Sequence, residues 1–302
     1  MNNHDNKNRL FHPVEMEPVQ DALASIDITD AEFNSIRSFI YEFFGINLTF
    51  RKKSLVKGRM QHYLKANGFT SFSDYIAFLE SDGSGTAVNE LINRISTNYT
   101  YFFRESQQFE FIFKEAFPAI IKMHEKNLDR DIRLWSAGCS SGDEAYSLLI
   151  TIMEFLGENY SDWDAGILAT DVCETVLSEG RKAIYSYDKL NGLDAGLVEK
   201  YFQKMPDGYY QIKPELKNEV IFRRFNLVNR VFPFKKQFEI IMCRNVMIYF
   251  DSQTRDNLIN KLYNLTKPGG YLFVGSSESF NRILSPYVFI QPGVYRRDEQ
   301  GE

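Results

Sequence analysis

The feature that most constrains the fold is a glycine loop between an apolar run and a helical pattern, at residues 134–150 (LWSAGCSSGDEAYSLLI). A buried strand that turns through small residues into a helix produces this pattern. In α/β domains such a turn lies at the carboxyl end of the first strand, where cofactors bind. A tight strand–helix connection with two solvated acids has the same pattern, so the loop alone leaves both interpretations open.

The chemistry of this loop disfavours a dinucleotide ligand. Gly138 and Gly142 are spaced G-x-x-x-G, so the G-x-G-x-x-G fingerprint is absent. Asp143 and Glu144 follow, and two carboxylates at the mouth of a phosphate-binding loop would repel a pyrophosphate. A ligand with a cationic part fits better, and S-adenosylmethionine carries an ammonium and a sulfonium but no phosphate. A nicotinamide-dependent dehydrogenase is therefore a distant alternative.

Apolar runs alternate with helical patterns through the carboxy-terminal two thirds of the chain. We expect strands at 132–137, 166–170, 219–225, 238–243 and 270–274, helices at 146–155, 175–183 and 252–265, and a late antiparallel strand at 288–295. This alternation predicts an α/β domain with a doubly wound parallel sheet. Aromatic pairs flanking a Pro-Asp-Gly turn predict a small inserted β-hairpin at about 200–222, with a surface excursion without a role as the alternative.

Polar residues follow two of the expected strands. Asp171 can accept hydrogen bonds from both ribose hydroxyls of an adenosine, or it can cap the helix expected near residue 175. Arg244 and Asn245 follow the apolar run 240–243. A charge in such a stretch costs several kcal/mol unless it is paired, so Arg244 needs a protein partner or a ligand.

The amino-terminal third predicts a loose tail at 1–25 and a small all-helical domain at 26–95. Thr29 and Glu32 form a capping box before an amphipathic helix that ends at Gly45, and further helices are expected at 52–67, 71–79 and 87–95. The helix at 52–67 and the residue before it carry six cations and almost no acid: Arg51, Lys52, Lys53, Lys57, Arg59 and Lys65. Because a solvated helix normally mixes both signs, we expect a docking surface for an acidic partner. A basic helix that serves solubility alone is the alternative.

Residues 96–105 join the two parts and concentrate hydrogen-bonding side chains, four aromatics and one arginine. An ordinary linker would be richer in glycine, proline and charge. We expect the aromatics to pack on the neighbouring domain while Asn98, Thr100 and Arg104 face a ligand, and the planar fork of Arg104 suits a carboxylate. The alternative is an ordinary helix between domains, with Arg104 in a structural ion pair.

Charge and composition exclude several classes of function. A net charge of −5 argues against general nucleic-acid binding through a basic surface. No apolar run reaches the length of a membrane span, and the amino terminus lacks the apolar core of a secretory signal. The three cysteines and four histidines form no spaced metal or disulfide pattern. We therefore expect a cytoplasmic protein with no metal site and no membrane insertion.

Seven motifs occur in unbroken order between about residues 28 and 297: TNYTYFFRE (97–105), WSAGCSSGDE (135–144), ATD (169–171), FNL (225–227), CRNVMIYF (243–250), PGG (268–270) and GSSE (275–278). Together they closely resemble the chemotaxis receptor methyltransferases (CheR). The resemblance implies a Rossmann-like S-adenosylmethionine-dependent methyltransferase domain at 106–299 with a small inserted β-subdomain, preceded by the helical domain and a linker that contributes to the cofactor site. It also implies methylation of glutamate side chains on the cytoplasmic helices of chemoreceptors, with S-adenosylhomocysteine as product.

The resemblance also implies roles for individual residues. The positions that would contact the cofactor are Asn98, Thr100, Arg104, Gly138, Glu144, Asp171, Asn226, Leu227, Arg244 and Asn245, and Arg104 and Tyr249 would lie nearest the transferred methyl. The basic helix resembles the receptor-contact helix of the family, which gives Lys53, Lys57 and Arg59 an acidic partner. Asp143 and Ala145 stand where a Glu and a Pro are usual.

Two further expectations follow from the resemblance. The hairpin loop, residues 205–209, looks shorter than in members that bind a peptide tether at the receptor's end, so we expect no tether binding. The main alternative function is a non-catalytic module that senses S-adenosylmethionine or S-adenosylhomocysteine. Retention of both Arg104 and Tyr249 disfavours this alternative.

Overall fold

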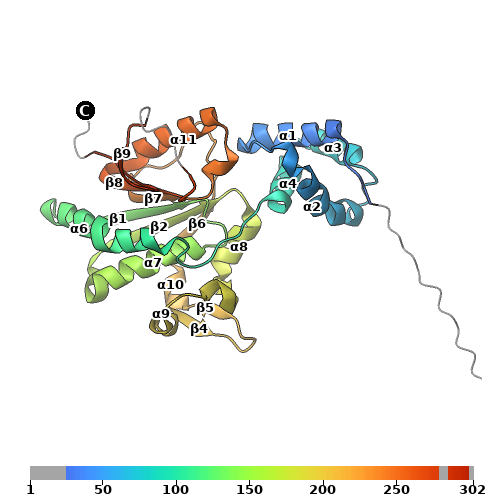
Figure 1. The fold of residues 1–302 in the computed structure, drawn as a ribbon. Coiled ribbons are helices and arrows are strands. Elements are labelled where there is room, and N and C mark those ends of the chain that lie inside the picture. The colour runs from blue at the N-terminus through green and yellow to red at the C-terminus, as the bar shows by residue number, and fades with distance from the viewer. Residues whose placement is uncertain (1–24, 279–284, 299–302) are drawn as a thin grey trace, which may run out of the picture.

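The structure is a computed structural model that describes residues 25–278 and 285–298. A small helical domain is joined by an extended segment to a larger domain built on a sheet (Figure 1). The loose tail expected at residues 1–25 lies outside the described residues, apart from Ser25. Within the described ranges, no helix is both long and apolar enough to cross a bilayer.

Four helices form the amino-terminal domain, as the sequence predicts: α1 (Asp30–Phe44), α2 (Lys53–Ala66), α3 (Phe72–Ser81) and α4 (Thr86–Ile95), with a short 3₁₀ turn, η1 (Phe50–Lys52), before α2. The capping box is confirmed, because Thr29 N donates to Glu32 Oε2 (2.8 Å) and Glu32 N donates to Thr29 Oγ1 (3.2 Å). The apolar faces of these helices meet in one core that includes Phe33, Met60 and Leu91. This packing stabilises helices that would be marginal in isolation.

Seven strands form the main sheet of the larger domain: β1 (Asp131–Ala137), β2 (Asp164–Asp171), β6 (Val220–Arg224), β7 (Phe238–Cys243), β8 (Thr266–Val274), β9 (Val288–Gln291) and β10 (Val294–Arg296). Their order is β6-β2-β1-β7-β8-β10-β9, with β10 antiparallel to both neighbours and the first five strands parallel. The doubly wound prediction is confirmed. The strand order reverses between β1 and β7, and ligands of open α/β sheets bind at such a switch point.

Helices cover both faces of this sheet: α5 (Ser106–Phe111), the π-helical turn η2 (Ile112–Ala116), α6 (Phe117–Lys126), α7 (Asp143–Leu156), α8 (Glu174–Lys182) and α11 (Ser252–Leu265), with η3 (Gly157–Asp162) after α7. Successive residues of β1 point to opposite faces, so Leu134 packs in the core with α6 and α7 while Trp135 packs in the core with α11. Figure 1 shows α6 and α7 on one side of the sheet and α11 on the other.

The inserted subdomain is larger than the sequence predicts. The hairpin of β4 (Phe202–Lys204) and β5 (Tyr210–Ile212) is confirmed, but β3 (Ile184–Tyr185) also pairs with β5, giving a three-stranded antiparallel sheet. The subdomain also contains η4 (Tyr187–Leu190), α9 (Ala195–Tyr201) and α10 (Pro214–Lys217). The insertion therefore starts near residue 184 rather than 200, and it ends before β6, because Val220 already belongs to the main sheet.

Two other elements differ from the expectation. The single late strand expected at 288–295 is a hairpin of β9 and β10 that turns at Gly293, where φ is +75°. The structure also contains a helical stretch from α5 to α6 before β1 that is not among the helices expected from the sequence.

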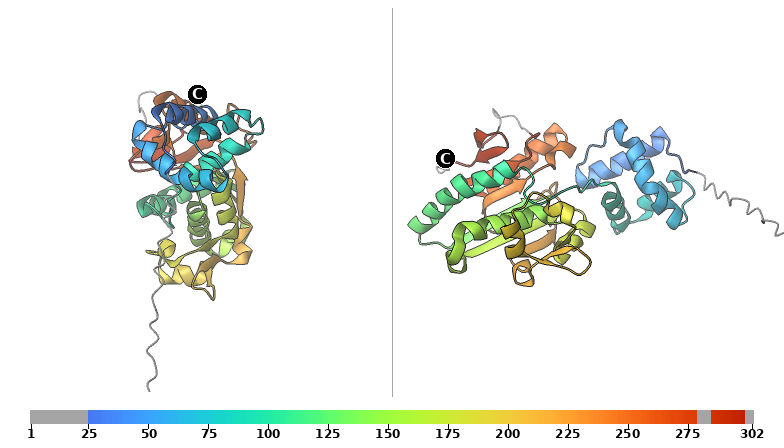
Figure 2. Two further views of the ribbon diagram at one scale, coloured as in Figure 1. Left: turned by 90° about the vertical axis from the view of Figure 1, so that its right-hand side faces the viewer. Right: turned by 60° about the horizontal axis from the view of Figure 1, so that its bottom comes forward.

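The helical domain lies at the carboxyl end of the main sheet and contacts the loops that follow β6 and β7 (Figures 1 and 2). Asn47 N donates to the carbonyl oxygen of Tyr249 (2.8 Å), and Tyr41 OH donates to Asp251 Oδ2 (2.6 Å). Asn226 Nδ2 donates to the carbonyl oxygen of Phe43 (2.6 Å). These contacts fix one wall of the space described next.

Candidate functional site

A cavity of about 600 Å³ lies between the helical domain and the carboxyl ends of the parallel strands. This volume is within the range of small-molecule sites. Its walls come from the segment after α1 and the start of α2, from the junction 96–104, and from the loops after β1, β2, β6 and β7. All ten predicted cofactor positions and Tyr249 are among its lining residues: Asn98, Thr100, Arg104, Gly138, Glu144, Asp171, Asn226, Leu227, Arg244, Asn245 and Tyr249.

The glycine loop forms the floor of this cavity. Gly138 has φ +89°, and a Cβ there would lie 2.4 Å from Cγ2 of Val246, in the loop after β7. The position therefore requires glycine both for its backbone conformation and for the close approach of the two loops. The loop is also tied to the junction, because Ser140 Oγ donates to the carbonyl oxygen of Asn98 (2.9 Å).

Asp171 holds the loop from the end of β2. Its carboxylate accepts from Ser140 N and from Cys173 N, each at 2.9 Å. Helix α8 begins at Glu174 with Cys173 as its N-cap residue, so Asp171 does not cap that helix. Burial raises the pKa of the Asp171 carboxyl despite these N–H bonds. Its two oxygens retain lone pairs that can accept hydroxyl donors of a ligand.

Glu144 and Asp143, the two carboxylates after the loop, face different surroundings. The expectation that both lie at the mouth of the loop is right for Glu144 and wrong for Asp143. Glu144 lines the cavity, accepts from Ser136 Oγ (2.7 Å), and its Oε2 lies 3.3 Å from Arg244 Nε. Burial raises the pKa of Glu144, while the positive charge of Arg244 opposes the shift. Asp143 is fully buried beside Lys189 of the inserted subdomain. Successive residues of a helix project about 100° apart, which separates these two side chains.

Arg244 is the buried cation of the site, with 5% of its surface exposed. Besides pairing with Glu144, it donates to the carbonyl oxygen of Arg104 and lies 5.5 Å from the centre of the Phe109 ring. Among the described residues, its Nη1 has no hydrogen-bond partner. An unsatisfied buried donor suits an anionic ligand group, while Glu144 and Asp171 suit ammonium and hydroxyl donors. The donor set thus fits the methionine and ribose parts of S-adenosylmethionine.

Arg104 and Tyr249 reach the same cavity from different segments. Arg104 Nη1 donates to the carbonyl oxygen of Tyr99 (2.9 Å), and the preceding residue, Phe103, donates its N–H to Ser147 Oγ of α7 (2.9 Å). Burial raises the pKa of Tyr249, while the charge of Arg104 opposes that rise. The Tyr249 hydroxyl is therefore protonated at neutral pH and available as a donor.

Glu278 is a site residue to which sequence reasoning gave no role. Its carboxylate accepts from Asn245 N (2.7 Å), Gly275 N (2.7 Å) and Ile248 N (3.1 Å). It thereby holds the loop that carries Arg244, Asn245 and Tyr249. The signal that could have found it is the motif GSSE at 275–278, which directly follows a buried strand and ends in an acid.

The basic helix α2 has more partners than its sequence suggests. Lys53 pairs with Asp30 (2.5 Å) and Lys57 with Asp27 (3.1 Å), so the idea of a helix without acidic partners is wrong for these two. Arg59 donates to the carbonyl oxygens of Ile95 and Ser96 at 2.6 Å, which ties α2 to the junction. The cation of this helical segment that lines the cavity is Lys52 rather than Lys53, Lys57 or Arg59. Receptor contact by those three residues stays a prediction.

Comparison with known proteins extends these observations. Residues 31–96 match the family described as "CheR methyltransferase, all-alpha domain", and residues 98–291 match "CheR methyltransferase, SAM binding domain". A chemotaxis protein methyltransferase of Borreliella burgdorferi is 41% identical over 91% of this chain and 96% of its own length. Those of Salmonella typhimurium and Escherichia coli are 32% and 33% identical over 89% of this chain, covering 90% and 91% of theirs.

Family and geometry agree on the ligand. The ten predicted cofactor positions lie in the matched S-adenosylmethionine-binding domain and carry the donors and acceptors which that cofactor needs, while the helical domain supplies the opposite wall of the cavity. No group of three or more His, Cys, Asp or Glu side chains suited to a metal ion occurs in the described parts of the chain. The chain belongs to the CheR methyltransferases, a family of chemotaxis enzymes whose cofactor is S-adenosylmethionine.

Proposed function

We propose that this protein methylates glutamate side chains on the cytoplasmic helical region of chemoreceptors, producing glutamyl methyl esters and S-adenosylhomocysteine in the cytoplasm. The observation that carries the proposal is that Arg104 and Tyr249 line the same cavity as the glycine loop, Glu144 and Asp171. A planar cation and a protonated phenol beside a sulfonium donor suit an incoming carboxylate.

The chemistry needs no general base. S-adenosylmethionine supplies an electrophilic methyl on a sulfonium, and a glutamate with a pKa of about 4.3 is already ionised at neutral pH. Opposite charges neutralise as the methyl moves, so the chain contributes mainly through orientation and exclusion of water. Orientation contributes up to about 7–11 kcal/mol in favourable cases.

Individual side chains have distinct parts in this proposal. Glu144, Asp171 and Arg244 hold the cofactor from the sheet side. Arg104 orients the methionine end or the incoming carboxylate, and Tyr249 donates its hydroxyl to that carboxylate. Each hydrogen bond of this charge-assisted kind contributes about 1.5–3 kcal/mol.

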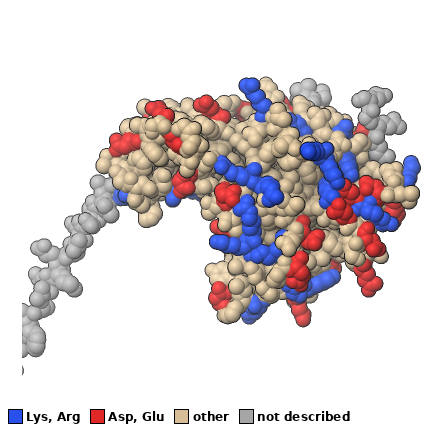
Figure 3. Space-filling model, turned by 180° about the vertical axis from the view of Figure 1, so that it is seen from behind, with Lys and Arg blue, Asp and Glu red and all other residues tan. Residues whose placement is uncertain are grey.

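The partner surface is proposed to include α2. Lys53 and Lys57 pair with Asp30 and Asp27, whose carboxylates are exposed, and exposed pairs contribute only about 0–1 kcal/mol. These lysines can therefore exchange their partners for acids of a receptor helix at small cost. We propose no peptide tether, given the short loop 205–209, and no membrane insertion. Figure 3 shows basic and acidic side chains interspersed over the visible face of the sheet domain, so this face offers no uniformly basic surface to a nucleic acid.

The test is transfer of labelled methyl from S-adenosylmethionine to purified cytoplasmic fragments of chemoreceptors. We expect base-labile label on specific glutamates, and loss of the label when those glutamates are replaced by glutamine. Binding of S-adenosylhomocysteine without label on any receptor fragment would contradict the proposal and favour the non-catalytic sensor.

A further inference from the structure

A lysine of the inserted subdomain contacts the glycine loop on the side that faces away from the cavity. Lys189 lies in η4, and its Nζ is 2.7 Å from Ser141 Oγ and 3.1 Å from Asp143 Oδ1. Asp143, the first residue of α7, has no exposed surface. A buried carboxylate is costly unless it is paired, so this contact is an essential part of the local structure.

The glycine loop has two sides. Residues 138–140 and Glu144 line the cavity, whereas Ser141 and Asp143, between them, contact the inserted subdomain. Tyr185 OH also donates to the carbonyl oxygen of Ser141 (2.9 Å). The subdomain therefore contacts the side of the glycine loop that faces away from the cavity. These contacts are made by Ser141 and Asp143, which lie between the two parts of the loop that line the cavity, residues 138–140 and Glu144.

The same lysine is joined to the junction that carries Arg104. The carbonyl oxygen of Lys189 accepts from Phe102 N (3.2 Å). The Phe102 ring packs edge-on against Tyr185 and Phe202, with ring centres 4.9 and 5.1 Å apart. Phe102 lies two residues before Arg104, so η4 supports both the loop and the junction.

We propose that Lys189 is a positioning residue for S-adenosylmethionine binding. Through Ser141 and Asp143 it holds residues 138–140 and Glu144 at the cavity wall without lining the cavity itself. The inserted subdomain is thereby part of the cofactor site. This inference concerns the cofactor and does not depend on which protein accepts the methyl.

The test compares full-length variants by calorimetric titration with S-adenosylhomocysteine, together with their thermal unfolding midpoints. Lys189→Met should weaken binding about tenfold, the equivalent of about one hydrogen bond between the loop and the ligand. It should also lower the midpoint, because Asp143 is left unpaired in the interior. The double variant Asp143→Asn/Lys189→Met removes that charge, so stability should recover while the affinity stays low.

A matched control comes from the same subdomain. Lys200 of α9 pairs with Glu154 (2.6 Å), towards the other end of α7 from Asp143. Lys200→Met should leave the affinity for S-adenosylhomocysteine within about twofold of the wild type. Recovery of full affinity in the double variant would overturn the proposal, since Lys189 would then only neutralise Asp143. Equal loss of affinity in the Lys200 variant would overturn it as well.

Discussion

The two ends of the central sheet bury charge in different ways. Near the amino end of β7, Glu239 has no exposed surface, and its carboxylate accepts from Arg133 N (2.7 Å) and pairs with Lys267 and His124. Directly after the carboxyl end of the same strand, Arg244 is almost as deeply buried, but among the described residues its Nη1 has no partner.

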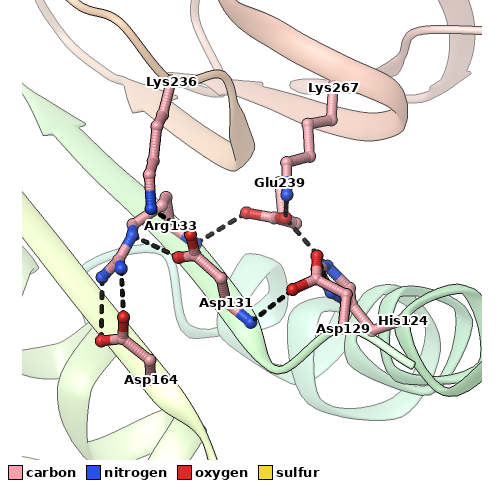
Figure 4. Close-up of polar contacts among 8 residues, drawn as sticks. All are labelled: His124, Asp129, Asp131, Arg133, Asp164, Lys236, Glu239 and Lys267. Carbon is pink, nitrogen blue, oxygen red and sulfur yellow. Dashed lines mark hydrogen bonds and ion pairs between the residues drawn. The ribbon is translucent and has the colours of Figure 1, made fainter. Parts of the chain in front are cut away.

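Figure 4 shows the pairing at the amino end: the Glu239 carboxylate contacts Lys267, His124 and the Arg133 amide, and the network continues through Arg133 and Asp131 to Asp164 and Lys236. A buried charge with all its partners in the protein serves the fold. A buried charge with an unsatisfied donor beside a cavity needs a ligand to complete it. We therefore expect changes at the amino end to affect stability and changes at the carboxyl end to affect binding and turnover.

The largest effect should come from Glu239→Ala. Removing the carboxylate takes away the partner of the Arg133 amide, of His124 Nε2 and of the partly exposed Lys267 ammonium, while His124 Nδ1 keeps its contact with Asp129 (3.1 Å). The free energy of unfolding in urea should fall by about 3–5 kcal/mol. The matched control is Lys236→Ala, because Lys236 is 62% exposed at the edge of the same network. That change should cost less than about 1 kcal/mol, and equal costs would contradict the idea of a buried structural centre.

The next largest effect should come from replacing both charges at the carboxyl end. Glu144→Gln/Arg244→Met leaves neither charge unpaired, so the unfolding midpoint should be unchanged or higher. Calorimetric affinity for S-adenosylhomocysteine should fall about 100-fold, the equivalent of one strong or two ordinary charge-assisted hydrogen bonds. Unchanged affinity would show that this pair is structural, like that of Glu239.

Arg104→Ala should lower methyl transfer at least about tenfold, because one charge-assisted hydrogen bond to the reacting groups is lost. The Arg104 side chain is partly exposed, so the unfolding midpoint should stay within a few degrees. Arg181→Ala is the control, since Arg181 is exposed and pairs with Glu174 at 2.5 Å on the surface of α8. Turnover equal to that of the control would remove Arg104 from the site.

The smallest effect should be the change in ligand affinity with pH, which near neutral pH is slight. Burial raises the pKa of both Glu144 and Asp171. The ligand donates to their ionised forms, so its affinity is fully present above the raised pKa values and falls as the pH drops through them. Titration at successively lower pH should show weakening that begins above the ordinary carboxyl range. Glu144→Gln should reduce that dependence, and a flat profile in the wild type would exclude these carboxylates as acceptors.

The sequence predicts the site at the carboxyl end of the sheet well, because the motifs that identify it are each contained in a short stretch of the chain. Three features each identify the end of a strand: the glycine loop, the acid after the next strand and the arginine after an apolar run. Because the strands are parallel, these ends lie together at the carboxyl edge of the sheet. The parallel sheet with helices on both faces follows from the alternation of strands and helices, whereas the order of its strands comes from the structure.

What the sequence could not predict depends on contacts between distant segments. Lys53 pairs with Asp30, the first residue of α1, and Lys57 with Asp27, which precedes that helix. Asp143 contacts Lys189, 46 residues away. The sequence predicts the start of the insertion too late, near residue 200, because β3 has only two residues, too few for an apolar pattern. In the sequence, Glu239 is an isolated acid in an apolar run. Its partners could not be predicted because they lie on three other elements, α6, β1 and β8.

We expect the charges at the amino end of the sheet to serve stability and those at the carboxyl end to serve binding. The most direct test of this difference is the thermal stabilisation that S-adenosylhomocysteine produces in two variants. A ligand that binds only the folded state raises the unfolding midpoint according to its affinity. Glu239→Gln should unfold at a lower temperature than the wild type but keep the full ligand-induced rise. Glu144→Gln/Arg244→Met should unfold at or above the wild-type temperature and lose that rise. Loss of the rise in the Glu239 variant, or its retention in the double variant, would contradict the account.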